Sequence, residues 1–327
     1  MILITGGAGF IGSNLVSALD KRGERVVVCD RLGHDEKWRN LAKHYLEDLV
    51  GPEQISDFLN RNVGDIEIIF HMGAISSTTE TDADKIIETN FRLSCYLWHW
   101  CKENDVRFVY ASSAATYGNG EAGFKDEETM AALAKLRPLN AYGWSKHLFD
   151  RWVANQKERG DCGPTQCVGL KFFNVYGPNE YHKGSMRSVA HQIFPFALRD
   201  EAFPLFRSYN PRYADGGQLR DFVWVGDCVN VMQWLLDRPK VNGLFNMGTN
   251  EARSFADLAK AVYIATGKEP MLAYREMPED LRPRYQYFTE ADMRKLRQAG
   301  YTVPFTALED GIREYVQNFL AQPDPYI

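Results

Sequence analysis

Short apolar runs alternate with amphipathic stretches along the first half of the chain. The runs that we expect to be buried strands are rich in Val, Ile and Phe and are bounded by polar or glycine residues. They are residues 2–5, 25–29, 66–71, 107–112 and 166–172. Between them, apolar residues recur at helical spacing over 11–21, 52–60, 83–104 and 141–159. This alternation predicts an α/β fold with a Rossmann-like, doubly wound parallel sheet, in which ligands bind beyond the carboxyl ends of the strands.

The pattern changes after about residue 175. Helical segments near 185–199, 229–236 and 254–266 are separated by stretches rich in Pro, Arg, Tyr and Gly. Residues 209–218 have no periodicity and are expected to be a loop, whereas 221–225 return to strand character. We therefore expect a Rossmann domain over 1–175 and a smaller α/β C-terminal lobe over 176–327, interleaved with the first and mainly binding substrate.

A glycine-rich turn follows the first expected strand and leads into the first helix. Gly6, Gly9 and Gly12 are spaced so that the backbone can approach a pyrophosphate, which the amides of the helix N-terminus would bind. Asp30 ends the second expected strand, where an acidic residue binds the adenosine ribose. Arg31 and Lys37 follow it and can neutralise a 2′-phosphate, which favours NADP, with NAD still possible; the alternative is solvated loop charge.

Further cofactor contacts are expected where later strands end. Met72, Gly73 and Ala74 follow the expected strand over 66–71 and should border the cofactor, whereas His71 is expected to be a satisfied core histidine. Asp48, in the stretch over 46–49, either contacts the adenine or caps the next helix.

A proton-transfer site is expected at the start of the helix over 141–159. Tyr142 and Lys146 form a Y-x-x-x-K pattern, so the phenol and the ammonium share one face of the helix. A nearby ammonium favours the phenolate, which makes the pair an acid–base for a hydroxyl or carbonyl oxygen. Ser113, directly after the expected strand over 107–112, can hydrogen-bond the same oxygen.

Together these residues resemble the extended short-chain dehydrogenase/reductase family over nearly the whole chain. The family's catalytic tyrosine, lysine and serine match Tyr142, Lys146 and Ser113. Members act on nucleotide-diphosphate sugars as epimerases, dehydratases or reductases. Ala114 and Ala115 stand where the 4,6-dehydratases carry an Asp-Glu pair, so dehydration is not expected.

Several runs resemble the bacterial epimerases that invert carbon 6 of ADP-heptoses for lipopolysaccharide synthesis. They are residues 76–80, 111–118, 173–178, 182–190, 220–223 and 284–286. The resemblance implies transient oxidation of ADP-D-glycero-β-D-manno-heptose by bound NADP, and Lys183 as a second proton-transfer residue beside Tyr142. Further implied cofactor contacts are Phe10, Ile11, Ser76, Asn90, Val175 and Lys183. Implied substrate contacts are Ser113, Asn174, Ser185, Gln192, Phe206, Arg207, Ser208, Arg220 and Tyr285.

The chain departs from this subfamily at three places. Gln192 stands where the family has a histidine, and Pro52 where it has a lysine near the adenosine phosphate, which weakens the expectation of NADP. The loop over 209–219 is longer than usual. From the residues alone, Arg220 either clamps a diphosphate or pairs with an acid such as Asp221.

Other functions remain open at this stage. A UDP-hexose 4-epimerase or a net reductase would use the same tyrosine, lysine and serine. A non-catalytic dinucleotide-sensing protein could share the fold, but the intact Tyr142 and Lys146 disfavour it.

Composition narrows the partners and the location. With 38 basic and 43 acidic residues the net charge is −5, and there is no long basic run, so we expect no nucleic-acid partner. The chain begins with neither a signal peptide nor a long apolar segment, so we expect no membrane partner. The six cysteines include no C-x-x-C pair, which indicates reduced thiols in a cytoplasmic protein without a metal site. A homo-oligomer is expected only by analogy with the family.

Overall fold

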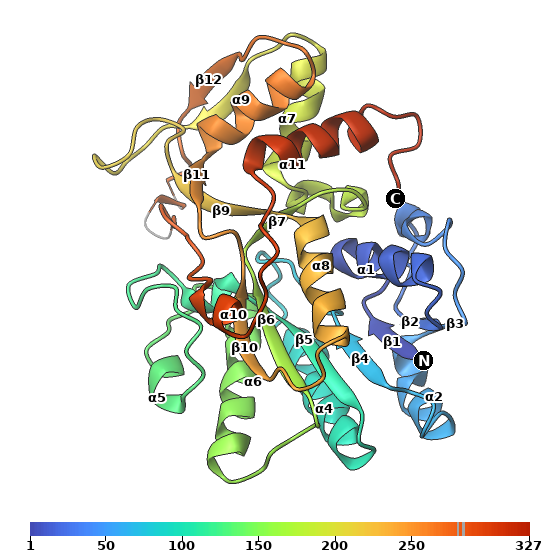
Figure 1. Cartoon of the computed structure of the whole chain (residues 1–327). Coiled ribbons are helices and arrows are strands. Elements are labelled where there is room, and N and C mark those ends of the chain that lie inside the picture. Colours follow the sequence, from blue (N-terminus) through green and yellow to red (C-terminus); the bar gives the residue numbers. More distant parts are fainter. Residues whose placement is uncertain (280, 283–284) are drawn as a thin grey trace.

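The computed structural model describes residues 1–279, 281–282 and 285–327. Within these residues, seven parallel strands form the central sheet, in the order β10-β6-β5-β4-β1-β2-β3 (Figure 1). They are β1 (Ile2–Thr5), β2 (Val26–Cys29), β3 (Asp48–Val50), β4 (Ile68–His71), β5 (Arg107–Ser113), β6 (Cys167–Phe172) and β10 (Gly243–Met247). The expected doubly wound sheet is confirmed, and β1, β2 and β4 are mostly apolar and buried at every position because helices cover both faces.

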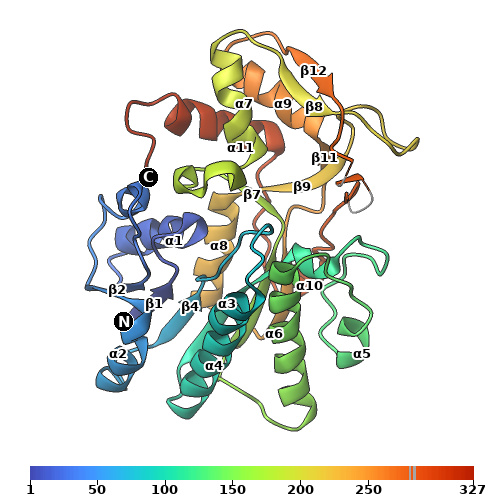
Figure 2. The ribbon, with the colours of Figure 1, turned by 180° about the vertical axis from the view of Figure 1, so that it is seen from behind.

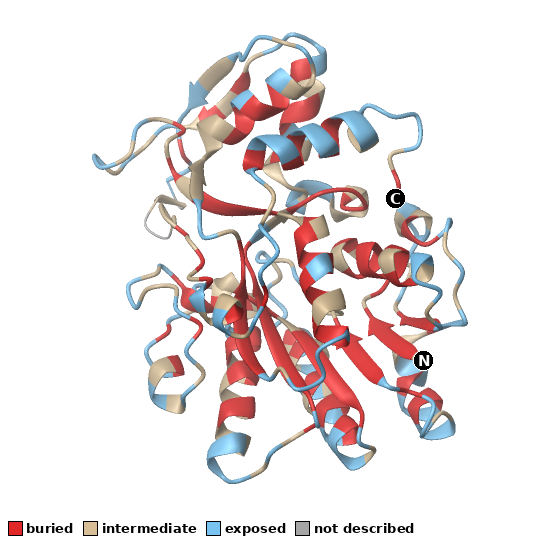
Figure 3. Cartoon of the chain, viewed as in Figure 1, coloured by how far each residue is buried: buried red, intermediate tan, exposed pale blue. Residues whose placement is uncertain are grey.

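Helices cover the two faces of this sheet. On one face α1 (Phe10–Lys21) packs against α8 (Val225–Leu236). On the other, shown in front in Figure 2, lie α4 (Leu93–Glu103) and α6 (Ala141–Glu158), which both contact β5. The short α2 (Ile55–Arg61) follows β3. Figure 3 shows the result, a sheet buried along most of its length between partly exposed helices.

The helix expected over 83–104 is not one regular helix. It consists of α3 (Ala83–Ile87), a π-helical turn over Glu88–Arg92, and α4. Such a turn inserts an extra residue and often occurs at functional sites. Here it contains Asn90, whose side chain is fully buried.

A second apolar cluster lies above the carboxyl ends of the strands. It is formed mainly by α7 (Val189–Leu198), α9 (Phe255–Ala265) and α11 (Leu308–Tyr315). Two small sheets accompany these helices. Their strands are β7 (Asn174–Tyr176), β9 (Leu219–Trp224) and β11 (Ala252–Ser254), and β8 (Phe203–Phe206) with β12 (Leu272–Arg275). Between β9 and β11 the chain returns to the first sheet, because α8 packs on α1 and β10 pairs with β6.

Several element boundaries differ from the expectation. The helix expected over 185–199 begins at Val189, where the side chain of Ser188 accepts a hydrogen bond from the amide of His191. The residues before it form a separate 3₁₀ turn over Tyr181–Met186. Short elements such as β3, β7, α5 (Met130–Leu133) and α10 (Arg294–Gln298) were not predicted, because three to five residues carry no readable periodicity. Among the described residues, no helix combines the length and the apolar character that crossing a bilayer requires.

Candidate active site

A cavity of about 680 Å³ lies at the carboxyl ends of the central strands, below the second apolar cluster. Most of the predicted cofactor and proton-transfer residues line it. They are Gly6, Gly9, Phe10, Ile11, Gly12, Asp30, Lys37, Met72, Gly73, Ala74, Ser76, Ser113, Tyr142, Lys146, Val175 and Lys183. Segments that are far apart in the sequence thus share one opening.

The glycine turn presents backbone rather than side chains to this cavity. Gly6 has φ +68°, and Gly9 precedes α1 with no side-chain cap, so the first amides of the helix are available to an anion. A Cβ at Gly12 would lie 2.2 Å from the carbonyl oxygen of Gly6. The turn can therefore hold the pyrophosphate of a dinucleotide only with glycine at these positions.

Asp30 and Lys37 lie together at the end of β2. The Asp30 carboxylate accepts hydrogen bonds from the amides of Ala8 (2.9 Å) and Arg31 (2.7 Å) and from the Lys37 ammonium (2.7 Å). The exposed guanidinium of Arg31 instead pairs with Glu53 at 3.3 Å and does not line the cavity. Of the two cations predicted near the adenosine ribose, Lys37 is therefore the one that faces the cavity.

The proton-transfer group lies at the N-terminus of α6. Asn140 caps this helix by accepting a hydrogen bond from the Gly143 amide (2.8 Å), which leaves Tyr142 and Lys146 one turn apart beside the cavity. Burial raises the pKa of Tyr142, and a hydrogen bond with Ser113 opposes that shift. Burial lowers the pKa of Lys146 to about 8, against the attraction of Asp150. A phenol, a hydroxyl and an ammonium can thus share the proton of one substrate oxygen.

A second ammonium reaches the cavity from the 3₁₀ turn over Tyr181–Met186. The Nζ of Lys183 lies 5.4 Å from the ring centre of Phe10. Burial lowers the pKa of Lys183, and the nearby Glu180 opposes this. The carboxylate of Glu180 is itself held by the Ser188 hydroxyl (2.6 Å) and the Tyr315 hydroxyl (2.8 Å). The turn that carries Lys183 is therefore fixed from behind by a buried acid.

Besides Arg31, two predicted cofactor residues, Asp48 and Asn90, lie outside the cavity wall. Asp48 begins β3, where its carboxylate accepts a hydrogen bond from the amide of Leu49, and it caps no helix. Asn90 acts behind the wall, since its amide binds the backbone N–H (2.8 Å) and carbonyl (3.0 Å) of Ile75 and the hydroxyl of Ser145 (3.0 Å). It joins the segment after β4 to α6 and so supports the cavity.

The predicted substrate residues divide into two groups. Ser113 and Asn174 line the cavity. The others lie outside its lining residues: Ser185, Gln192, Phe206, Arg207, Ser208, Arg220 and Tyr285. Arg284, quoted with Tyr285 in one of the resembling runs, lies outside the described residues.

Three of these outer residues form a cluster next to the cavity. The guanidinium of Arg220 lies 5.4 Å from the ring centre of Tyr285, and the rings of Tyr285 and Phe206 are 6.3 Å apart. Arg220 also lies 5.5 Å from the ring centre of Phe255, which does line the cavity. Asp221 does not pair with Arg220, since its carboxylate accepts hydrogen bonds from the backbone amides of 249, 250 and 291. The cluster therefore extends the site outward from the cavity.

The structure adds lining residues that the sequence did not single out. His182 precedes Lys183 in the 3₁₀ turn, Arg187 follows the last residue of that turn, and Phe255 and Leu258 come from α9. The first two belong to the run over 182–190, so the run itself was the available signal. The α9 residues show only the ordinary apolar spacing of a packed helix.

Comparisons with known proteins agree with this arrangement. The family model described as the NAD dependent epimerase/dehydratase family matches residues 2–248. The ADP-L-glycero-D-manno-heptose-6-epimerase of Nitratidesulfovibrio vulgaris strain DP4 is 50% identical over 330 residues, covering 100% of both chains. The protein of the same name from Fusobacterium nucleatum is 45% identical over 336 residues, again covering 100% of both.

Two solved structures share the fold over nearly the whole chain. The Helicobacter pylori ADP-L-glycero-D-manno-heptose-6-epimerase is 29% identical with a TM-score of 0.77, over 97% of this chain and 95% of that chain. The Thermus thermophilus UDP-glucose 4-epimerase in complex with NAD is 26% identical with a TM-score of 0.74, over 96% of this chain and 97% of the other.

Proposed function

The chain belongs to the NAD dependent epimerase/dehydratase family, and from this we propose that it converts ADP-D-glycero-β-D-manno-heptose into ADP-L-glycero-β-D-manno-heptose. One observation carries the proposal: Lys183 lines the same cavity as Tyr142, Lys146 and Ser113. Identity of 45–50% to heptose 6-epimerases over full length supports it against the 4-epimerase alternative, for which the Thermus structure is 26% identical. The product would serve lipopolysaccharide synthesis.

The cofactor is a nicotinamide dinucleotide, which fits the glycine turn and Asp30 in the lining of the cavity of about 680 Å³. When bound, it would accept a hydride from carbon 6 and return it to the opposite face. The chain's own residues move the protons. In one orientation of the substrate, Tyr142 takes the hydroxyl proton, with Lys146 stabilising its phenolate. In the other, after the carbon-6 ketone has rotated, Lys183 supplies the proton to the carbonyl oxygen.

Two proton-transfer groups suit a substrate that presents two faces. Burial lowers the pKa of Lys183, so near pH 7 a larger fraction of its amine is neutral than in a solvated lysine, and the group can both give and take a proton. Over one turnover the proton that Tyr142 takes balances the proton that Lys183 gives, and the hydride would return to the carbon that it left, so no net proton or hydride is consumed. Exchange with solvent then restores the protonation of the two groups, and in the reverse reaction each takes the opposite role. This balance distinguishes the epimerase from a reductase, which would oxidise one NADPH per product.

Incubation with ADP-D-glycero-β-D-manno-heptose tests the proposal directly. We expect a mixture of the two carbon-6 epimers, resolved by chromatography or NMR, without net change in nicotinamide absorbance. Turnover of UDP-galactose instead would support a 4-epimerase, and stoichiometric loss of NADPH a reductase. A protein that binds the dinucleotide but turns over none of these substrates would be a sensing protein, and the proposal would be abandoned.

We further propose that the dinucleotide is NADP and that Lys37 binds its 2′-phosphate. Lys37 already lies 2.7 Å from Asp30 and offsets the negative charge that would repel a phosphate. Lys37→Ala should lower NADP affinity about tenfold or more, because a charge-assisted hydrogen bond contributes about 1.5–3 kcal/mol. NAD affinity should change little. Calorimetric titration of both cofactors into apoprotein measures the two values.

Arg31→Ala is the matched control for this experiment. Its guanidinium is exposed and pairs with Glu53, so its removal should leave both affinities within about twofold. A tenfold preference of the wild type for NAD would refute the assignment of NADP.

A further inference from the structure

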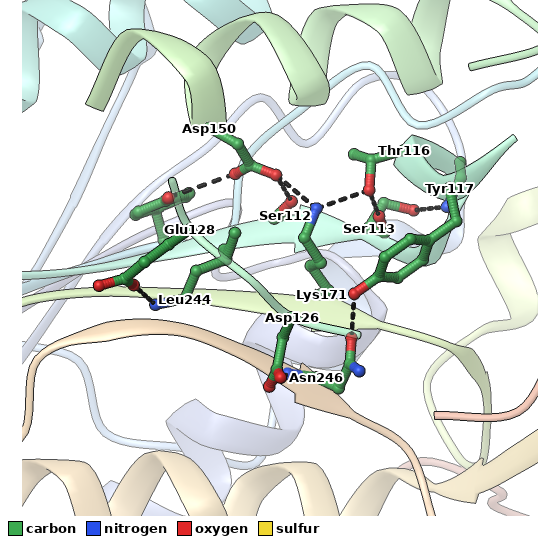
Figure 4. Close-up of polar contacts among 12 residues, drawn as sticks. Ser112, Ser113, Thr116, Tyr117, Asp126, Glu128, Asp150, Lys171, Leu244 and Asn246 are labelled. Carbon is green, nitrogen blue, oxygen red and sulfur yellow. Dashed lines mark hydrogen bonds and ion pairs between the residues drawn. The ribbon is translucent and has the colours of Figure 1, made fainter. Parts of the chain in front are cut away.

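A buried ion pair, drawn in Figure 4, joins β6 to α6 at a position one helical turn along α6 from Lys146. Lys171, on β6, and Asp150, on α6, have side chains that are 0% exposed, and the Nζ of Lys171 is 2.7 Å from the Oδ2 of Asp150. Asp150 follows Lys146 by one helical turn, so the two side chains lie on the same face of α6. Neither Lys171 nor Asp150 lines the cavity, so neither can touch the substrate.

The ion pair is joined to the strand end that carries Ser113. Lys171 also donates to the hydroxyl of Thr116 (2.6 Å), which donates in turn to the carbonyl oxygen of Ser113 (2.8 Å). The hydroxyl of Ser112 donates to the same carboxylate oxygen of Asp150 (2.7 Å). Figure 4 shows these contacts converging on Lys171 and Asp150 from β5, β6 and α6. This network therefore connects the strand end that carries Ser113 to the helix that carries Tyr142, and so fixes the positions of these two side chains relative to each other.

Asp150 is also the charged group whose attraction acts on Lys146. The titratable groups that face the network from the elements packed against it are His71, Tyr110, Tyr117, Glu128 and His147. Burial lowers the pKa of His71 to about 3 and that of His147 to about 4, and it raises the pKa of both tyrosines, so these four are neutral near pH 7.

Glu128 is already paired, with Lys295 at 3.2 Å and Lys157 at 3.5 Å. The balance near Lys146 is therefore one carboxylate, Asp150, shared between two ammonium groups. Removing either member of the ion pair changes that balance in opposite directions.

We infer that Asp150 and Lys171 are positioning residues for proton transfer, which hold Ser113 against Tyr142 and set the charge that Lys146 presents to the phenol. The inference rests on the proposed function, because it concerns the same site. It predicts a behaviour that a purely structural ion pair would not show. Without Asp150, Lys171 repels the Lys146 ammonium, whereas without Lys171, Asp150 attracts only Lys146.

The test compares the pH dependence of kcat in Asp150→Asn and Lys171→Met. Both variants should lower kcat about tenfold while KM stays within about threefold, because neither residue contacts the substrate. The alkaline limb should move to lower pH in Asp150→Asn and to higher pH in Lys171→Met, on the order of one pH unit each. Lys157→Met, which removes a partly exposed cation from the same helix, should shift nothing. Shifts in the same direction, or none, would overturn the inference.

A second variant and a second measurement cover the other outcomes. If Asp150→Asn or Lys171→Met does not fold, Thr116→Val removes only the hydroxyl that links Lys171 to the carbonyl oxygen of Ser113. This variant should still lower kcat with KM retained. An unchanged kcat in that variant would refute the positioning role. Should the wild type not epimerise ADP-heptose, the proposed function fails, but ultraviolet titration of the Tyr142 hydroxyl still decides the inference. The signal of Tyr142 is obtained by subtracting the titration curve of the same protein that also carries Tyr142→Phe. The midpoint of this difference curve should move to lower pH in Asp150→Asn and to higher pH in Lys171→Met.

Discussion

Replacing Tyr142 by phenylalanine is expected to lower kcat for carbon-6 epimerisation about 10³-fold, with KM and cofactor affinity nearly unchanged. The substitution removes one oxygen from the cavity wall and keeps the ring, so the binding surface is retained while the acid–base group is lost. Positioned proton transfer contributes about 10²–10⁴ in rate. Among the hydroxyl groups that line the cavity, only that of Tyr142 has a lysine one helical turn away to stabilise its phenolate, so no other can replace it. Steady-state kinetics with resolved epimers, alongside cofactor titration, measures both effects.

Tyr96→Phe provides the matched control for this variant. Its hydroxyl lies on the surface, 2.9 Å from that of Ser56, and Tyr96 is not among the residues that line the cavity. It should keep the full rate. If Tyr142→Phe retained more than a tenth of the wild-type kcat, the phenol would not be the group that moves the proton.

The cofactor half of the site could be predicted from the sequence because its determinants are local. The glycine turn, Asp30 and Lys37 are each placed by one strand, one turn and the start of one helix. Tyr142 and Lys146 need only the periodicity of a helix to share a face. Where a motif and its geometry lie within a few consecutive residues, reading the chain is enough to place the side chains.

The outer part of the site depends on contacts between distant segments. This cluster consists of Phe206, Arg220 and Tyr285, which come into contact only because β8, β9 and the segment before α10 converge. The hydrophobic periodicity of these three segments does not predict that contact. The resemblance to the family named all three, but their placement outside the cavity lining came only from the structure.

Buried polar groups were the least visible feature of the sequence. Lys171 occurs in an otherwise apolar strand, and Asp150 is one of many polar residues on a long helix. Each would ordinarily be assigned to solvent, since lysine and aspartate are rarely fully buried unless paired. Their pairing requires that β6 pass beneath α6, which is a property of the sheet order rather than of either segment.

Replacing Lys183 by arginine is the second substitution with a large expected effect. Arginine keeps the positive charge beside Phe10 but stays protonated at any accessible pH, so it can bind an anion without exchanging a proton. We expect kcat for epimerisation to fall about 10²-fold or more, with KM nearly retained. Because the proposed mechanism assigns one orientation of the substrate to Lys183 and the other to Tyr142, the variant should lose one half of the reaction selectively.

Supplying the carbon-6 ketone of the substrate with NADPH separates the two halves. The wild type should give both epimers, Lys183→Arg mainly the one protonated by Tyr142, and Tyr142→Phe mainly the other. Lys85→Arg, an exposed lysine paired with Glu80, should behave as the wild type. If both active-site variants lost both epimers equally, a single group would handle both faces, and Lys183 would only bind the substrate or the cofactor.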